Sequence, residues 1–150
     1  MSRVTDFLMA VQGMAKMQDS VIKEVCTQFD LTLTEGKVLT FLFNNPEKDT
    51  AGDIVELRNL SKGNVSIAVE GLIKKHLLER TQDQKDRRKI HLSLLPATKP
   101  ITDLIENRQN YYGEELFSGF SEEERVLYMD MHRRMTENAK KAIKRSRRDE

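Results

Sequence analysis

The chain has one cysteine, no long apolar run and no segment typical of export. Cys26 has no second cysteine to pair with, so an intramolecular disulfide is excluded, which agrees with a reducing compartment. No run approaches the roughly 20 apolar residues that a membrane-spanning helix needs. The N-terminus also lacks a basic segment followed by an apolar one. We therefore expect a cytoplasmic protein that has no membrane partner.

Motifs typical of catalytic and metal sites are missing as well. The sequence has no Gly-rich phosphate loop, no nucleophile elbow and no paired-carboxylate arrangement, and Ser121-Glu122-Glu123-Glu124 is explained as a helix cap. His76, His91 and His132 are far apart and are not spaced with cysteine or carboxylates as metal ligands are. The sequence therefore predicts neither an enzyme nor a metal or other cofactor.

The charge is unevenly distributed, although the total is only +1 over 150 residues. Residues 61–100 carry nine basic and four acidic side chains, a net charge of +5, and residues 140–150 carry a net charge of +4. The segments 1–60 and 101–139 carry −3 and −5. Such asymmetry can direct a phosphate backbone to one face of the molecule.

The stretch from Leu60 to Leu95 changes its hydrophobic period in the middle. Its first half has apolar residues three and four apart behind Ser61, a good N-cap, which predicts a helix. Its second half alternates apolar and polar residues on either side of a charged run over 83–89, which predicts two strands and a loop. A helix followed by such a hairpin is the outline of a recognition helix and a β-wing.

Helical spacing also predicts helices on both sides of this stretch. They are expected over residues 2–29, from Leu33 to Asn44 with Thr34 as the cap, from Asp49-Thr50 onward, from about Lys99 to Phe117, and from Ser121 onward. The short turn Arg58-Asn59-Leu60 then makes the third and fourth helices a helix-turn-helix.

We therefore predict a mainly α fold with a small β-wing, organised as one domain over residues 1–150. A winged helix-turn-helix head would occupy 31–98, and helical arms would occupy 1–30 and 99–150. The arms carry apolar stripes that no sheet covers, so we expect a second subunit to cover them around a two-fold axis.

The order of elements and several residues resemble the MarR family of winged-helix regulators. The most specific part is Asp86-Arg87-Arg88 followed by Ile90-His91-Leu92-Ser93-Leu94, which is similar to the family's Asp-x-Arg wing signature and returning strand. Leu72-x-Lys74-Lys75-x-Leu77-x-x-Arg80 also fits the family's helix-to-strand junction.

The chain departs from the family at two positions. His76 replaces the common glycine at the end of the fourth helix, so a left-handed cap there is expected to be strained or absent. Leu95-Pro96-Ala97-Thr98-Lys99-Pro100 replaces the usual Leu-Thr-x-x-Gly, which should alter how the fifth helix leaves the sheet.

The resemblance implies a homodimer that binds a pseudo-palindromic DNA operator and represses transcription until a small lipophilic or phenolic ligand, or an oxidant, acts on it. The runner-up is a winged-helix protein-interaction module that does not bind DNA. A charged hairpin alone is usually a solvated loop, and a serine before a helix is usually only a cap. Their combination with a net charge of +5 favours double-stranded DNA.

The resemblance places one set of DNA-contacting residues at the start of the fourth helix. Asn64 is the best candidate for reading a base, because its amide can pair bidentately with adenine. Ser61 and Lys62 are expected to meet phosphate, and Gly63 would let the helix approach closely. The remaining candidate at this end is Ser66.

The second set lies in the wing. Arg88 matches the family arginine that enters the minor groove, and Asp86 resembles the carboxylate that orients it. Lys85, Arg87 and Lys89 would contact phosphates. Thr50, at the start of the third helix, would add another phosphate contact.

Two further features leave alternatives open. Phe7, Tyr111 and Tyr112 could line an effector cavity between an arm and the head, although aromatic residues on helix stripes are more often core. Cys26 could be a peroxide-sensing thiol, but its apolar neighbours Val25 and Phe29 favour a buried, inert cysteine.

Overall fold

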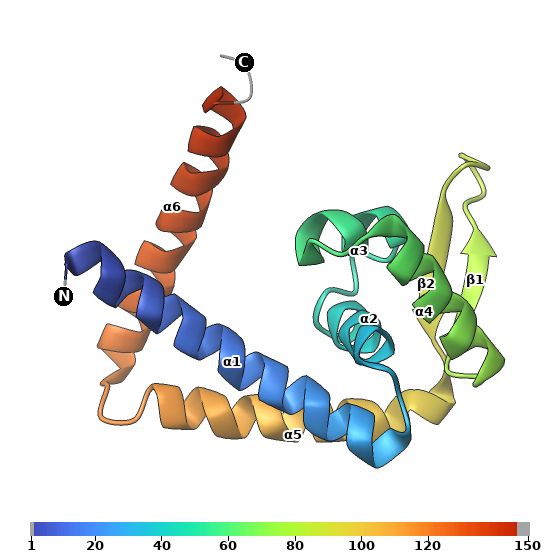
Figure 1. Cartoon of the computed structure of the whole chain (residues 1–150), viewed down its shortest axis with the longest axis horizontal. Coiled ribbons are helices and arrows are strands. Elements are labelled where there is room, and N and C mark those ends of the chain that lie inside the picture. Colours follow the sequence, from blue (N-terminus) through green and yellow to red (C-terminus); the bar gives the residue numbers. More distant parts are fainter. Residues whose placement is uncertain (1, 147–150) are drawn as a thin grey trace. The chain divides into compact units, whose positions relative to one another are not determined.

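The structure is a computed structural model that describes residues 2–146, and helices with one small sheet make up its regular elements (Figure 1). The predicted fold class, mainly α with a small β-wing, is confirmed. In chain order the elements are α1 (Arg3–Phe29), α2 (Leu33–Asn44), α3 (Ala51–Arg58), α4 (Lys62–Lys74), β1 (Leu78–Gln82), β2 (Ile90–Leu94), the short 3₁₀ helix η1 (Pro96–Thr98), α5 (Lys99–Leu116) and α6 (Glu122–Ser146).

The chain divides into two compact units, Met1–Tyr112 and Gly113–Glu150. The first unit holds the helix-turn-helix, the wing, α1 and most of α5, and the second holds α6. The proposed division into a head over 31–98 and two arms stays a prediction, and residues 147–150 of the second arm lie outside the described residues. None of the helices in the described part of the chain is both long and apolar enough to cross a membrane.

Side-chain caps set the beginnings of the helices. Thr50 with Asp53 and Ser121 with Glu124 form the two predicted capping boxes, and Ser61 accepts from the backbone N–H of Asn64 at 3.2 Å. These predictions are confirmed. Caps of this kind can be read from the sequence because the donor and the acceptor lie three residues apart.

The predicted cap of α2 is wrong. Thr32, not Thr34, caps this helix: its hydroxyl accepts from the Glu35 N–H at 3.2 Å, and the Glu35 carboxylate accepts from the Thr32 N–H at 2.9 Å. Thr34 lies inside the first turn. A capping box needs a side chain that can accept a hydrogen bond three residues on, and Thr32 has Glu35 there whereas Thr34 has Lys37.

The end of α4 keeps a left-handed residue without glycine. His76 has φ of 56°, and the N–H of Leu77 donates to the carbonyl of Leu72 at 3.0 Å. Of the two expected outcomes, the structure has the strained cap rather than none. Pro96 then opens η1, which leads directly into α5.

The core of the first unit lies where α2 packs between α1 and α4. Its fully buried side chains come from α1, α2, α3, α4, the hairpin and α5, and the largest are Ile22, Leu39, Ile54, Leu72, Leu78 and Ile105. α1 lies beside α5 (Figure 1), and Arg108 of α5 donates to Glu24 of α1 at 2.6 Å. The core thus joins the long helices to the helix-turn-helix.

An ion pair with a buried carboxylate fixes α4 against α2. The Glu35 side chain is only 6% exposed, and its carboxylate accepts from the Lys75 ammonium at 2.8 Å. Gly71 of α4 faces the same carboxylate, and a Cβ at that position would lie 2.2 Å from Glu35 Oε1. The position of the recognition helix therefore depends on a contact between residues 40 positions apart.

Candidate nucleic-acid interface

The helix-turn-helix presents one face of α4 to solvent. Asn59 closes α3 with φ of 51°, a left-handed conformation that asparagine tolerates, so the chain turns sharply into Ser61 and α4. Val65 and Leu72 point into the core, which leaves the opposite face of the helix exposed. The exposed residues at its N-terminal end include every candidate predicted there: Ser61, Lys62, Gly63, Asn64 and Ser66.

The hydroxyls of Ser61 and Thr50, the caps of α4 and α3, already form hydrogen bonds within the protein. Ser61 accepts from Asn64, and the Thr50 hydroxyl donates to the Asp53 carboxylate at 2.7 Å. This bond is the main reason that the pKa of Asp53 lies below its ordinary value. Asp53 therefore stays ionised beside Thr50, and its charge would oppose a phosphate at that position.

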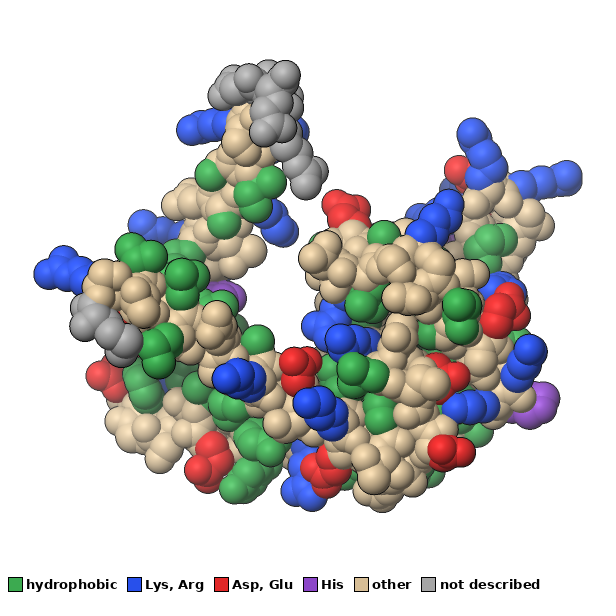
Figure 2. Space-filling view, viewed as in Figure 1, with side chains coloured by type: hydrophobic (Ala, Val, Ile, Leu, Met, Phe, Trp, Pro, Cys, Tyr) green, Lys and Arg blue, Asp and Glu red, His purple; other side chains and the backbone are tan. Residues whose placement is uncertain are grey.

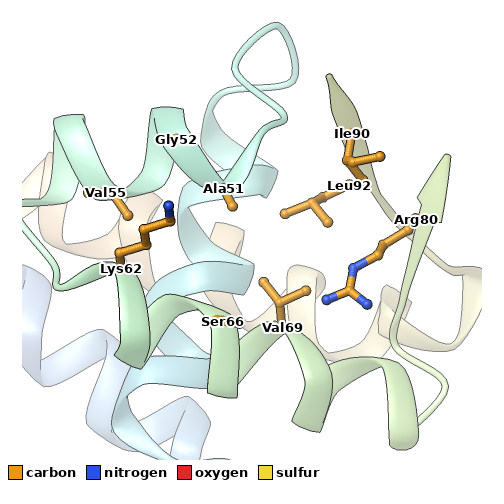
Figure 3. A pocket seen from close by; sticks show the side chains of 9 residues that line it. All are labelled: Ala51, Gly52, Val55, Lys62, Ser66, Val69, Arg80, Ile90 and Leu92. Atoms are coloured by element: carbon orange, nitrogen blue, oxygen red, sulfur yellow. The ribbon is translucent and has the colours of Figure 1, made fainter. Parts of the chain in front are cut away.

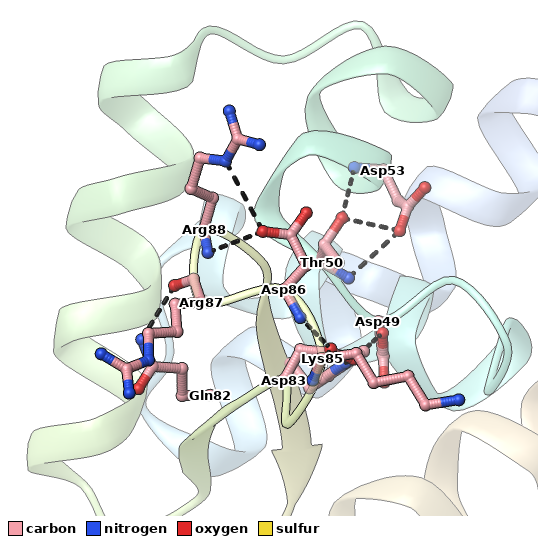
Figure 4. Close-up of polar contacts among 10 residues, drawn as sticks. Asp49, Thr50, Asp53, Gln82, Asp83, Lys85, Asp86, Arg87 and Arg88 are labelled. Atoms are coloured by element: carbon pink, nitrogen blue, oxygen red, sulfur yellow. Dashed lines mark hydrogen bonds and ion pairs between the residues drawn. The ribbon is translucent and has the colours of Figure 1, made fainter.

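The wing is an ordered hairpin (Figure 4). β1 and β2 pair antiparallel from Leu78 opposite Leu94 to Gln82 opposite Ile90. Within the connecting loop, Asp83 Oδ1 accepts from the backbone N–H groups of Lys85 at 2.8 Å and Asp86 at 2.7 Å. An aspartate that binds the backbone two and three residues on stabilises a turn, so the loop has a defined shape.

Arg88 lies in the wing loop, where its side chain is almost fully exposed and is paired with Asp86. Its side chain is 95% exposed, and Nε lies 3.6 Å from Asp86 Oδ1, which also accepts from the Arg88 backbone N–H at 3.0 Å (Figure 4). Lys85, Arg87 and Lys89 are also exposed. Figure 2 shows lysine and arginine side chains projecting from this hairpin. The loop thus offers positive charge to a partner while Asp86 restrains the arginine.

A cavity of about 450 Å³ is lined by two of the predicted α4 residues and by residues of the hairpin strands, but by none of the predicted loop residues 85–89 (Figure 3). It lies between α3, α4 and the hairpin, and most of its lining is apolar. The lining residues are Ala51, Gly52, Val55, Lys62, Ser66, Val69, Arg80, Ile90 and Leu92. Because Lys62 and Ser66 share it with Ile90, the start of α4 and the wing belong to one region of the surface. Ile90 stays 37% exposed, and only Leu92 of β2 is buried.

The three aromatic residues predicted for an effector site lie elsewhere. Phe7 is on α1 and is 50% exposed, whereas Tyr111 and Tyr112 are neighbours on α5 with their rings edge to face, 5.4 Å between centroids. None of them lines the cavity between α3, α4 and the wing. Their role in ligand binding stays a prediction.

Two features of this region were not predicted: an ion pair and an exposed apolar side chain. Arg80 of β1 pairs with Glu70 of α4 at 2.5 Å, which ties the wing to the recognition helix. Ile67 is 73% exposed on the outer face of α4, between Gly63 and Glu70 along the helix. Its spacing from the buried positions could have shown that it points away from the core, because Ile67 lies two residues from Val65 and Val69.

Neither a reactive thiol nor a metal site is found among the cysteine, histidine and acidic side chains of residues 2–146. The Cys26 thiol donates to the Thr32 carbonyl at 3.3 Å, and burial raises its pKa, which lowers the fraction of reactive thiolate. Over residues 2–146, no group of three histidine, cysteine or acidic residues is arranged to hold a metal ion.

Comparisons with known proteins agree on one family. The model of the MarR family matches residues 29–89. The transcriptional regulator AdcR of Streptococcus pneumoniae serotype 2 (strain D39 / NCTC 7466) is 30% identical over 101 residues, which cover 67% of this chain and 68% of AdcR. The uncharacterized HTH-type transcriptional regulator YsmB of Bacillus subtilis (strain 168) is 22% identical over 85% of this chain and 87% of its own.

A solved structure shows the same fold. A MarR family transcriptional regulator from Listeria monocytogenes, crystallised with a 26mer DNA, superposes with a TM-score of 0.72 at 19% identity and covers 87% of both chains.

Proposed function

The chain belongs to the MarR family of DNA-binding transcriptional regulators, which are not enzymes, and from this premise we propose that it binds a pseudo-palindromic operator as a homodimer and represses transcription. The observation that carries this proposal is the exposed start of α4 beside a hairpin loop of exposed cations in one compact unit. The proposed location is the cytoplasm, where its DNA would be.

The two parts of this surface have different roles in the proposal. The start of α4 enters the major groove, where the Asn64 amide pairs with adenine, and Lys62 meets a phosphate. Ser61, Gly63 and Ser66 line the closest approach of the helix to the groove. The wing enters the adjacent minor groove with Arg88, whose direction Asp86 restrains.

Phosphate contacts would hold both parts in register. Lys85, Arg87 and Lys89 surround the wing tip and supply charge without reading bases. Thr50 would add a contact only if its hydroxyl left Asp53. In this proposal the phosphate contacts position the protein on the duplex. Asn64 and Arg88 select the DNA sequence.

Exposed apolar side chains support the homodimer. In the first unit one group of them occupies the N-terminal half of α1: Val4, Phe7, Leu8, Met9 and Val11. In the second unit they lie along α6: Val126, Leu127, Met129, Met131, Met135 and Ile143. Apolar stripes of this extent are usually covered, and a second copy related by a two-fold axis would cover them while bringing two heads to one operator.

An effector that releases the DNA is the last part of the proposal. A small lipophilic or phenolic molecule would suit either Phe7, Tyr111 and Tyr112 or the cavity between α3, α4 and the wing. In the cavity, Lys62 and Arg80 could meet an acidic group on an otherwise apolar ligand.

A binding titration with a double variant tests the proposal. The probe is a labelled duplex selected from a random pool by the wild-type protein. Asn64→Ala together with Arg88→Ala is expected to weaken binding about 100-fold or more, because one bidentate base contact is worth about 1 to 3 kcal/mol and each dimer loses two. The matched control, Asn107→Ala with Arg134→Ala, removes the same residue types from α5 and α6 and should bind as the wild type does. If the pool yields no duplex, the proposal fails and the protein-interaction module takes its place.

Ile67 is expected to sense thymine methyl groups in the same duplex. Replacing the thymines of each half-site by deoxyuridine should weaken wild-type binding about fourfold per contacted methyl, since a buried carbon contributes about 0.8 kcal/mol. Ile67→Ala should bind the two duplexes equally well. If the alanine variant still prefers thymine, Ile67 does not contact the methyl group.

A further inference from the structure

His91 lies between two carboxylates at the base of the wing. Its Nδ1 is 2.8 Å from Asp49 Oδ1, and its Nε2 is 2.9 Å from Asp83 Oδ2. Asp49 belongs to the connection between α2 and α3, whereas Asp83 begins the wing loop, so the imidazole joins two segments that are far apart in sequence.

The protonation state follows from this geometry. A neutral imidazole has one N–H and therefore donates to one acceptor only, whereas the imidazolium donates from both nitrogens. Both partners of His91 are carboxylate oxygens, which only accept when ionised. The arrangement is complete only when His91 carries its proton.

Hydrogen bonds of Asp49 and Asp83 connect the segment before α3 with the wing tip. The Leu92 N–H donates to the Asp49 carbonyl at 2.7 Å, beside the His91 contact. The second oxygen of Asp83 accepts from the Lys85 and Asp86 backbone N–H groups, and Asp86 in turn restrains Arg88. Loss of one bond at His91 would therefore loosen the loop that carries Arg88.

We propose that His91 is a positioning residue for DNA binding, which holds the wing against the start of α3 while it is protonated and loosens the wing when the proton leaves. This inference rests on the proposed function, because wing position matters only if the wing meets DNA. No second molecule and no metal is needed for the effect.

The expected pH window follows from the charged groups that face His91. They are Asp83 of the wing loop and Asp49 of the α2–α3 connection, which together raise the pKa of His91 above its ordinary 6.5. A raised pKa means that the contribution is complete below pH 6.5 and is lost as the pH rises through the higher value. The pKa of Asp83 is lowered to about 2, mainly by His91, so this carboxylate stays ionised throughout the window.

A titration of the free protein tests the protonation state without DNA. We expect the His91 ring signals in a ¹⁵N NMR titration to show both nitrogens protonated at pH 6 and one at high pH. The exchange protection of the Lys85 and Asp86 amides, corrected for intrinsic rates, should fall about tenfold across the same transition. A His91 ring that is neutral at pH 6, or protection that does not follow the ring titration, would overturn the proposal.

DNA affinity at two pH values tests the consequence. At a pH above the measured His91 ring transition, the wild type should bind its selected duplex about tenfold more weakly than at pH 6.0, the effect of losing one charge-assisted hydrogen bond per head. His91→Gln should bind equally at both values, at the weaker level. His76→Asn, which removes a histidine outside the interface and keeps a residue suited to φ of 56°, should behave as the wild type does.

Outcomes for the two hypotheses are distinct. If His91→Gln keeps the pH dependence of the wild type, His91 is not the group responsible and the inference fails. If no duplex is bound at any pH, the proposed function fails, while the ring titration and amide protection still decide whether His91 holds the wing. Should His91→Gln fold poorly, Asp49→Asn removes the carboxylate charge that favours the imidazolium and lets the amide donate to a neutral ring, so it should also flatten the pH profile.

Discussion

Raising the monovalent salt from 50 to 200 mM is expected to weaken binding of the dimer to its duplex by about 10³-fold to 10⁵-fold, if about 6 to 10 phosphates are contacted. The cations that would make these contacts are exposed in each head: Lys62, Lys85, Arg87 and Lys89. Two heads on one operator double the number. Each neutralised phosphate releases counterions, so the effect on affinity grows with every contact.

The slope of affinity against salt concentration, measured by fluorescence anisotropy on a logarithmic scale, checks this expectation. Arg87→Ala should reduce the slope by about 2, because each dimer loses two phosphate contacts at about 0.9 per contact. Lys23→Ala removes an exposed lysine from α1 and should leave the slope unchanged. Binding that is indifferent to salt would mean that the basic loop does not meet a phosphate backbone.

Gly36→Ala is expected to destabilise the protein by about 1 to 3 kcal/mol, the usual cost of overpacking a core. Gly36 is buried where α1 crosses α2, and a Cβ there would lie 2.4 Å from Cys26 Sγ and 3.1 Å from Ile22 Cγ2. Neither neighbour can easily move, because Ile22 is fully buried and the Cys26 thiol donates a hydrogen bond to the Thr32 carbonyl. The helices would have to separate.

A double-mutant cycle shows whether the clash with sulfur is the cause. Cys26→Ala removes Sγ, so Gly36→Ala should cost much less in that background. Urea denaturation at one fixed protomer concentration gives the free energies of unfolding, since stability of a dimer depends on concentration. Gly13→Ala is the matched control: a Cβ at Gly13 meets nothing within 4 Å, so alanine should stabilise α1 by up to about 1 kcal/mol. Equal costs of Gly36→Ala in both backgrounds would contradict the proposed clash.

Most of the fold could be predicted because its signals are local. The capping boxes at Thr50 and Ser121 and the cap at Ser61 depend on groups three residues apart, and the change of period after α4 marks the wing. One predicted cap, Thr34, is wrong. Two threonines lie near the start of α2, and only Thr32 has Glu35 three residues on.

The candidate interface could be predicted in part. The charged run over 83–89 predicts the exposed cations of the wing, and the cap and helical period from Ser61 predict the exposed start of α4. The proposed contribution of Ile67 was not predicted, because an isolated apolar residue on a polar helix face gives no sign of its partner. The effector residues Phe7, Tyr111 and Tyr112 stay a prediction, since a cavity depends on which side chains meet in space.

The sequence by itself determined the order of the helices, the hairpin and the family, because helical period, strand alternation and caps act over a few residues. Only the tertiary structure decided that Lys75 meets the buried Glu35, 40 positions away, and that His91 meets Asp49, 42 positions away. Such contacts form when packing brings distant segments together, and no local pattern specifies a charged partner at that separation. The position of the recognition helix and the proposed hold on the wing both depend on them.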